Sequence, residues 1–212
     1  MKRLSLVGIL CSILSLVGLG SCHESTLRQD ILGEWVGDPK ILKNLEWMGG
    51  GQTKVYSFDW TFGSGSRGWI KAGKTLTLRE EGDEAYLNVS IVTPIIYNVY
   101  DDGLAFRFEK DSIQVEILEY LINGENYKDV LARNAKGEGK AALQSASDTV
   151  IEQLKELVRE DVRRQIDTPL EIIYNYDYNY DARVKDDILT LKQGGKIPLT
   201  FHRKKSPGAT AP

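Results

Sequence analysis

Hydrophobic and polar positions alternate with a period of two along much of the chain from Lys54 onward. Short runs of this kind are separated by turn signals such as Asp101-Asp102-Gly103, which is typical of antiparallel strands. We therefore expect a mainly β protein with about eight to ten short strands, a pattern that favours a barrel or a sandwich. The clearest run places four aromatic side chains on one face: Tyr56, Phe58, Trp60 and Phe62.

One later segment has a different period. Between about residues 140 and 166, apolar side chains recur every three or four positions, which predicts one long inserted helix that ends before Thr168-Pro169. Such a helix is marginal in isolation, so we expect its stripe to pack on the β-body, either as a lid over one mouth of the barrel or as support along its outside. The stripe comprises Leu143, Ala146, Val150, Leu154, Leu157, Val158, Val162 and Ile166.

The first 21 residues have the order of a secretory leader. Lys2 and Arg3 precede an apolar run over residues 4–20, and small residues follow it. The stretch Leu19-Gly20-Ser21-Cys22 resembles the bacterial lipobox, in which the cysteine receives lipid and the chain is cleaved before it. The alternative is a plain transmembrane anchor, but the run is at the short limit for a span and would not need a terminal cysteine.

The lipobox resemblance implies a signal peptide over residues 1–21 and a mature protein anchored to a membrane through lipid on Cys22. An Asp after the lipidated cysteine tends to retain such proteins in the inner membrane of diderm bacteria. His23 stands there instead, so the resemblance implies the outer membrane. We expect residues 22–30 to be a lipidated tether, 31–204 the folded domain with the helical insertion, and 205–212 a flexible tail.

Charge and cysteine content narrow the chemistry. The formal net charge is -3, and removal of Lys2 and Arg3 with the leader makes it -5. This balance shows no electrostatic footprint for nucleic acid. Cys11 lies in the leader, so Cys22 is the only cysteine of the mature chain. An internal disulfide, thiol redox chemistry and a cysteine zinc site are thereby excluded.

The folded domain resembles the lipocalin-like, or calycin, lipoproteins at its two ends. Gly33-Glu34-Trp35 is similar to their Gly-x-Trp opening, and residues 199–203 are similar to their closing strand, which often ends in an Arg that stacks on the Trp. Leu199, Phe201 and Arg203 share one strand face, as alternation requires. The resemblance implies a closed barrel in which Trp35 and Arg203 are neighbours, and it implies binding of a small apolar or amphipathic ligand or of a protein.

Four tyrosines mark a candidate ligand-lining strand. Aromatic rings on one face can stack on a sugar or line an apolar cavity, although ordinary core packing explains the same alternation. The four are Tyr174, Tyr176, Tyr178 and Tyr180.

No catalytic constellation is recognisable, and we expect neither a metal nor a cofactor. The mature chain has two histidines, His23 and His202, and lacks a nucleophile elbow. A glycosidase-type carboxylate pair stays open as an alternative. Residues 63–68 match the dinucleotide-binding motif G-x-G-x-x-G, which requires a helix directly after it. A strand pattern follows here instead, so these residues predict a hairpin turn. The calcium-loop pattern that starts at Asp177 fails because Ala182 occupies the required glycine position.

These observations favour a lipid-anchored, lipocalin-like protein that binds a small apolar or amphipathic ligand in the cell envelope. The first alternative is an envelope interaction or scaffold protein that uses the long helix or the outer barrel face. The second is a carbohydrate-active hydrolase. A deep apolar pocket would favour ligand binding, an exposed apolar helix stripe would favour the scaffold, and carboxylates clustered in a cleft would favour the hydrolase.

Replacement of Cys22 tests the anchor directly. We expect Cys22→Ser to move the protein from the membrane fraction to the soluble fraction, because the residue that carries the acyl chains is lost. Fractionation without detergent measures this. A Cys11→Ser variant is the control and should stay in the membrane fraction, and an unchanged distribution of Cys22→Ser would contradict the lipid anchor.

Overall fold

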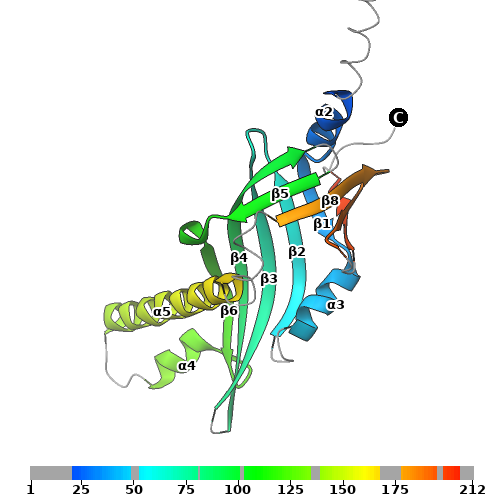
Figure 1. Ribbon diagram of the computed structural model, residues 1–212. Helices are drawn as coiled ribbons and strands as arrows, with labels where there is room; N and C mark the ends of the chain where they lie inside the picture. Colours follow the sequence, from blue (N-terminus) through cyan, green and yellow to red (C-terminus); the bar gives the residue numbers. More distant parts are fainter. Residues whose placement is uncertain are drawn as a thin grey trace, which may run out of the picture.

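The computed structural model describes residues 21–48, 53–80, 82–100, 103–134, 139–167, 178–194 and 198–205 (Figure 1). Residues 1–20 of the expected leader, Tyr174, Tyr176 and residues 206–212 lie outside these ranges. The strands are β1 (Gly33–Gly37), β2 (Thr53–Phe62), β3 (Arg67–Glu80), β4 (Asp83–Tyr100), β5 (Gly103–Phe108), β6 (Gln114–Ile122), β7 (Glu125–Asn126), β8 (Tyr178–Lys185), β9 (Ile188–Lys192) and β10 (Leu199–Arg203). The helices are α2 (Ser21–Asp30), α3 (Pro39–Met48), α4 (Tyr127–Asn134) and α5 (Lys140–Asp167), with a short 3-10 turn, η1, at Lys110–Ser112.

Eight of the strands form a closed antiparallel barrel. Around the ring the order is β1, β2, β3, β4, β5, β8, β9 and β10, and β10 pairs with β1. Apart from the closing β10–β1 pair, neighbours in the ring are consecutive in the chain except between β5 and β8, where β6, β7, α4 and α5 are inserted. The predicted mainly β, antiparallel barrel with one long inserted helix is confirmed. Closure leaves no unpaired edge strand in the ring.

The long strand β4 joins the barrel to a second, smaller sheet. One edge of β4 pairs with β3 from Asp83 to Ile96. The other edge pairs with β5 from Ile95 to Tyr100 and with β6 from Ala85 to Val92. The barrel is therefore closed around the second half of β4, while the first half continues beyond it as an open sheet (Figure 1).

The alternating side chains of β4 supply both hydrophobic cores. In the second half of β4, Ile95, Tyr97 and Val99 face the barrel interior. In the first half, the residues on the same face, such as Val89, pack against α5. The second core is formed where the end of α5 crosses this open sheet: Leu87, Val89, Ile91, Ile113, Val115, Val158 and Ile166. Because the inner face of β4 is continuous, α5 packs on the extension of the barrel lining, as Figure 1 shows.

The packing of α5 differs along its length. The second half buries Val158 and Ile166, and the side chains of Arg159 and Arg163 donate hydrogen bonds to the backbone oxygens of Ile113 and Lys110. Leu157 lies in this same half but is 61% exposed, so its place in the predicted stripe was wrong. In the first half, Leu143 and Val150 are only half-buried and Ala146 is exposed. The stripe therefore packs mainly through Val158 and Ile166, and the first half extends past the sheet (Figure 1).

Residues 22–30, expected as a tether, are helical in the structure. Leu27 and the following Ile31 are buried in the barrel core, so α2 covers one end of the barrel. This segment shows no amphipathic pattern, because only these two apolar side chains make the contact. At the other end, α3 inserts Ile41 into the same core.

A matched pair of substitutions in α5 tests this packing. Ile166→Ala should lower the free energy of unfolding by about 2–4 kcal/mol, because it removes buried methyl groups and leaves a cavity. Leu157→Ala, at an exposed position of the same helix, should change it by less than about 0.5 kcal/mol. Denaturant unfolding of the mature domain measures both. Equal effects would contradict the packing of α5 on the sheet.

Candidate functional site

The structure brings Trp35 and Arg203 together at the junction of the first and last strands. They are register partners in the β1–β10 pair, and the guanidinium carbon of Arg203 lies 4.3 Å from the centre of the Trp35 ring. The indole is fully buried and its Nε1 donates to the Ile31 oxygen at 2.7 Å. A guanidinium over an indole face is attractive, so this contact stabilises the closed ring.

Arg203 also ties three backbone segments together. Its Nη1 donates to the Leu32 oxygen at 2.7 Å and its Nη2 to the Asp30 oxygen at 2.6 Å. Its Nε donates to the Asp187 carboxylate at 2.9 Å, in the turn between β8 and β9. One side chain therefore connects the end of α2, the last strand and a neighbouring hairpin. The resemblance to lipocalin-like proteins implied the stack on Trp35 but not these carbonyl contacts.

Aromatic side chains fill the interior of the barrel. The ring of Trp60 lies 5.0 Å from Phe106, 5.4 Å from Phe201 and 5.7 Å from Phe62, measured between ring centres. The Phe106 contact is edge-to-face, an arrangement that aromatic quadrupoles favour. These rings occupy the space where a ligand would lie in a hollow barrel. Within the described residues, the centre of the barrel is a packed core.

Of the four candidate tyrosines, Tyr180 is the one whose side chain is described. It is half-buried on the inner face of β8, and its ring stacks on Phe106 with centres 5.8 Å apart. Burial raises the pKa of its hydroxyl to about 12. The backbone of Tyr178 belongs to β8, opposite Phe106, whereas Tyr174 and Tyr176 lie outside the described residues.

Lys74 is a charged residue on the inner face, and sequence reasoning missed it. It follows Ile70 and Ala72 on one face of β3, and its Nζ lies 3.5 Å from Oε1 of Gln165 on α5. Desolvation lowers the pKa of Lys74, while the nearby Asp161 carboxylate raises it. The lysine sits where α5 crosses the end of the barrel. Strand parity could have identified it, because its position in the alternation predicts an inward-facing side chain.

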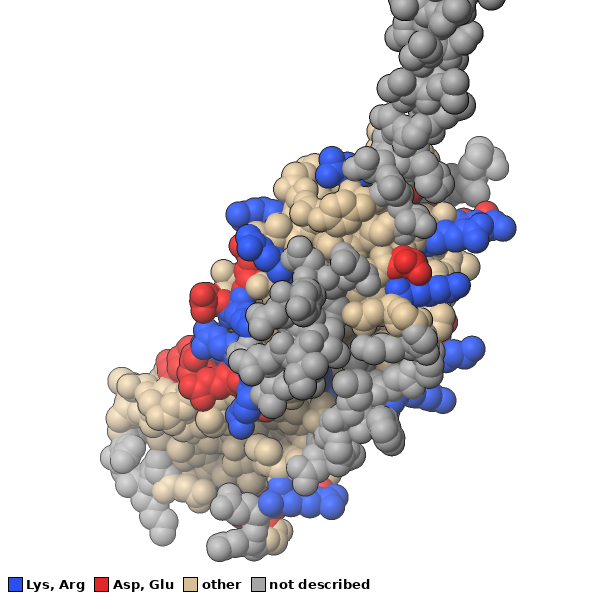
Figure 2. Space-filling model, viewed as in Figure 1, with Lys and Arg blue, Asp and Glu red and all other residues tan. Residues whose placement is uncertain are grey.

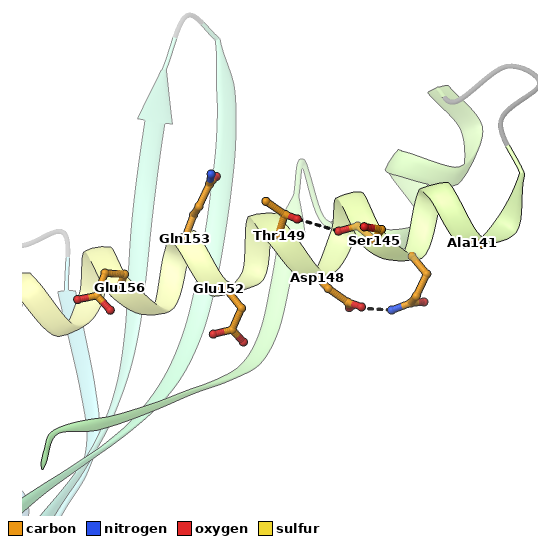
Figure 3. Close-up of a pocket in the computed structure, with 8 residues that line it drawn as sticks. Ala141, Ser145, Asp148, Thr149, Glu152, Gln153 and Glu156 are labelled. Atoms are coloured by element: carbon orange, nitrogen blue, oxygen red, sulfur yellow. Dashed lines mark hydrogen bonds between the residues drawn. The ribbon is translucent and has the colours of Figure 1, made fainter.

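An open hollow runs along the first half of α5, lined by the side chains of one helix face (Figure 3). Gln144 donates to the Asp148 carboxylate at 2.8 Å, and the Thr149 hydroxyl donates to the Ser145 oxygen at 2.9 Å. Acidic side chains gather over this helix on the face shown in Figure 2. The lining is Ala141, Gln144, Ser145, Asp148, Thr149, Glu152, Gln153 and Glu156.

A second hollow lies beside η1, lined by Ile96, Arg107 and residues 108–112. Both hollows are therefore outside the barrel. In the described part of the chain, no group of three or more His, Cys, Asp or Glu side chains is placed to hold a metal ion. The described helices also include none with the length and apolar character to cross a membrane.

The glycine-rich match at residues 63–68 and the Asp186-Asp187 pair both form hairpin turns. Gly65 and Ser66 have φ values of 83° and 63° in the turn between β2 and β3, and β3 follows directly. Asp186 and Asp187 form the turn between β8 and β9, with φ values of 51° and 60°. Asp101 and Asp102 lie outside the described residues, as do residues 1–20.

No family model, no curated protein and no solved structure matches the chain. The barrel is consistent with a lipocalin-like fold, and a closed barrel of this kind is compatible with ligand binding.

Substitution of Arg203 tests its role in closing the barrel. Arg203→Ala should lower the free energy of unfolding by about 2–4 kcal/mol, because it removes the stack on Trp35 and leaves backbone oxygens without their charged donor. The neighbouring Lys204, whose ion pair with Glu34 is on the surface, provides the control. Lys204→Ala should leave the unfolding midpoint nearly unchanged. If the two variants are equally stable, Arg203 does not hold the ring closed.

The raised pKa of Tyr180 predicts a loss of stability at alkaline pH. In the unfolded chain a tyrosine titrates near pH 10, so between about pH 10 and 12 the folded protein retains a proton that the unfolded chain releases. The contribution is complete below pH 10 and is lost as the pH rises toward 12, by about 2–3 kcal/mol in total. Urea unfolding across this range should show a shallower decline for Tyr180→Phe. Identical declines would contradict the burial of the hydroxyl.

Proposed function

We propose that the mature chain is a lipid-anchored protein of the cell envelope that binds a partner protein through the polar face of α5. The observation that carries this proposal is the contrast between the two parts of the molecule. The barrel interior is filled by aromatic rings, whereas the first half of α5 extends beyond the sheet with an open hollow along it (Figures 1 and 3). The barrel then acts as a rigid support.

The proposed location rests on the leader. The lipobox-like stretch that ends at Cys22 supports lipid attachment, and His23 supports the outer membrane of a diderm bacterium. A surface-tethered support that presents a polar helix is suited to protein contacts, because anchoring raises the local concentration of both partners.

The chemistry of the α5 face suits a partner with a basic segment. Asp148 and Glu152 are exposed one turn apart and project to the same side of the helix (Figure 3). Glu152 accepts a hydrogen bond from Lys155, while Glu156 is held by Arg159 and Arg163. Hydroxyl and amide groups between the carboxylates provide further hydrogen bonds. Complementary charge contributes mainly to specificity and to the association rate.

Site-specific photocrosslinking in cells tests this proposal. A photoreactive residue at Gln144 should give a discrete protein adduct, whereas one at Arg183, exposed on the barrel wall, should not. Glu152→Lys should abolish the Gln144 adduct without changing the circular dichroism spectrum, because it reverses charge on an exposed position. Equal adducts from both positions, or an adduct insensitive to Glu152→Lys, would contradict binding by this face.

A second candidate function is binding of a small amphipathic ligand at the α5 end of the barrel. Lys74 favours it, because a half-buried cation beside an apolar core can pair with an anionic head group. The half-buried Tyr180 hydroxyl lies on the same inner surface of the ring. Native mass spectrometry of the soluble Cys22→Ser protein distinguishes the two functions. A retained small molecule that disappears in Lys74→Met would favour the ligand, and an unliganded mass favours the α5 face.

A further inference from the structure

We propose that the end of the barrel that carries α2 rests against the lipid surface in which the protein is anchored. The inference depends on the proposed lipid attachment at Cys22 and adds the orientation of the body to it. Its basis is the short, ordered connection between Cys22 and the barrel.

The connection is a helix packed into the barrel. Leu27 is 7% exposed and Ile31 is fully buried, and both belong to the barrel core. The Ile31 nitrogen donates to the Leu27 oxygen at 2.9 Å, and the Trp35 indole donates to the Ile31 oxygen. Cys22 and Leu27 lie five positions apart, which is about 7–8 Å of helix. A lipid on Cys22 therefore keeps this end of the barrel within about one and a half helical turns of the head groups.

Neighbouring segments form a continuous end surface around α2. The helix contacts β4 and β8. The Tyr97 nitrogen of β4 donates to the Ser66 oxygen and the Tyr97 hydroxyl to the Gly63 oxygen, which fixes the β2–β3 hairpin at the same end. Arg203 holds the β8–β9 turn through Asp187. Figure 1 shows α2 at this end and α3 and α5 toward the opposite end.

Exposed aromatic side chains at this end have the chemistry of the head-group region. Tyr100, the last residue of β4, is 50% exposed, and Trp69, two residues into β3, is 44% exposed. Tyrosine and tryptophan combine an apolar ring with a polar group and are enriched at membrane–water interfaces. Away from this end, the exposed large side chains are mostly aliphatic, at Leu78, Leu118 and Leu157, and Tyr56 of β2 is the aromatic exception.

Charge does not set this orientation. Exposed Arg28 and Arg67 lie at the α2 end together with exposed Asp30 and Asp186. Because both signs are present, the contact depends on the anchor and the aromatic side chains. It should therefore form on neutral phosphatidylcholine vesicles and persist at high salt.

Spin labels on the acylated protein test the orientation. Acylation consumes the sulfur of Cys22, so Tyr100→Cys, Arg67→Cys and Leu157→Cys each introduce a single reactive thiol at an exposed position. On phosphatidylcholine vesicles, the accessibility of labels at 100 and 67 to a water-soluble nickel relaxant should fall at least threefold relative to detergent-free protein with Cys22→Ala. The label at 157 should stay fully accessible.

The outcomes separate the anchor from the orientation. If the acylated protein co-floats with the vesicles but the label at 100 stays accessible to the nickel relaxant, the barrel does not contact the lipid and the proposed orientation is wrong. If shielding at 100 occurs in cell envelopes but not on pure lipid vesicles, a protein covers this end and the proposal is overturned. If the protein does not float with the vesicles, the lipid anchor itself fails, and the inference fails with it.

Discussion

The stack of Arg203 on Trp35 is the interaction on which the closed barrel depends. A sheet of eight strands has two edges, and they meet where β1 pairs with β10. The pair is short, so backbone hydrogen bonds alone give limited stability. Arg203 adds the contact with the buried indole and hydrogen bonds to the oxygens of Asp30 and Leu32. The same side chain therefore stabilises both the closure of the ring and the position of α2.

A closed ring of this size is just wide enough for side chains to fill it. Trp60 occupies the centre and contacts rings from β2, β5 and β10. The helices α2 and α3 add Leu27, Ile31 and Ile41 to the same core. Because the interior is packed, the surfaces open to a partner lie on the outside and at the end crossed by α5, and the proposed function uses the polar face of that helix.

The double role of β4 links these parts. One face of this strand lines the barrel in its second half and supports α5 in its first half. The insertion between β5 and β8 is therefore attached to the barrel by a shared strand. The two proposals therefore concern opposite ends of the molecule: the α2 end is proposed to face the lipid, and the polar face of α5 is proposed to bind a partner.

The sequence by itself determined the period of each segment, because side-chain alternation of two and of 3.6 residues reflects local backbone geometry. It thereby predicted the strands, the long helix and the shared face of Phe201 and Arg203. Only the tertiary structure decided which strands pair across the insertion, that the interior is packed, and that Leu157 is exposed while Val158 is buried. It also decided that residues 21–30 form a helix docked by two side chains. These features depend on contacts between residues far apart in the chain, which local periodicity does not encode.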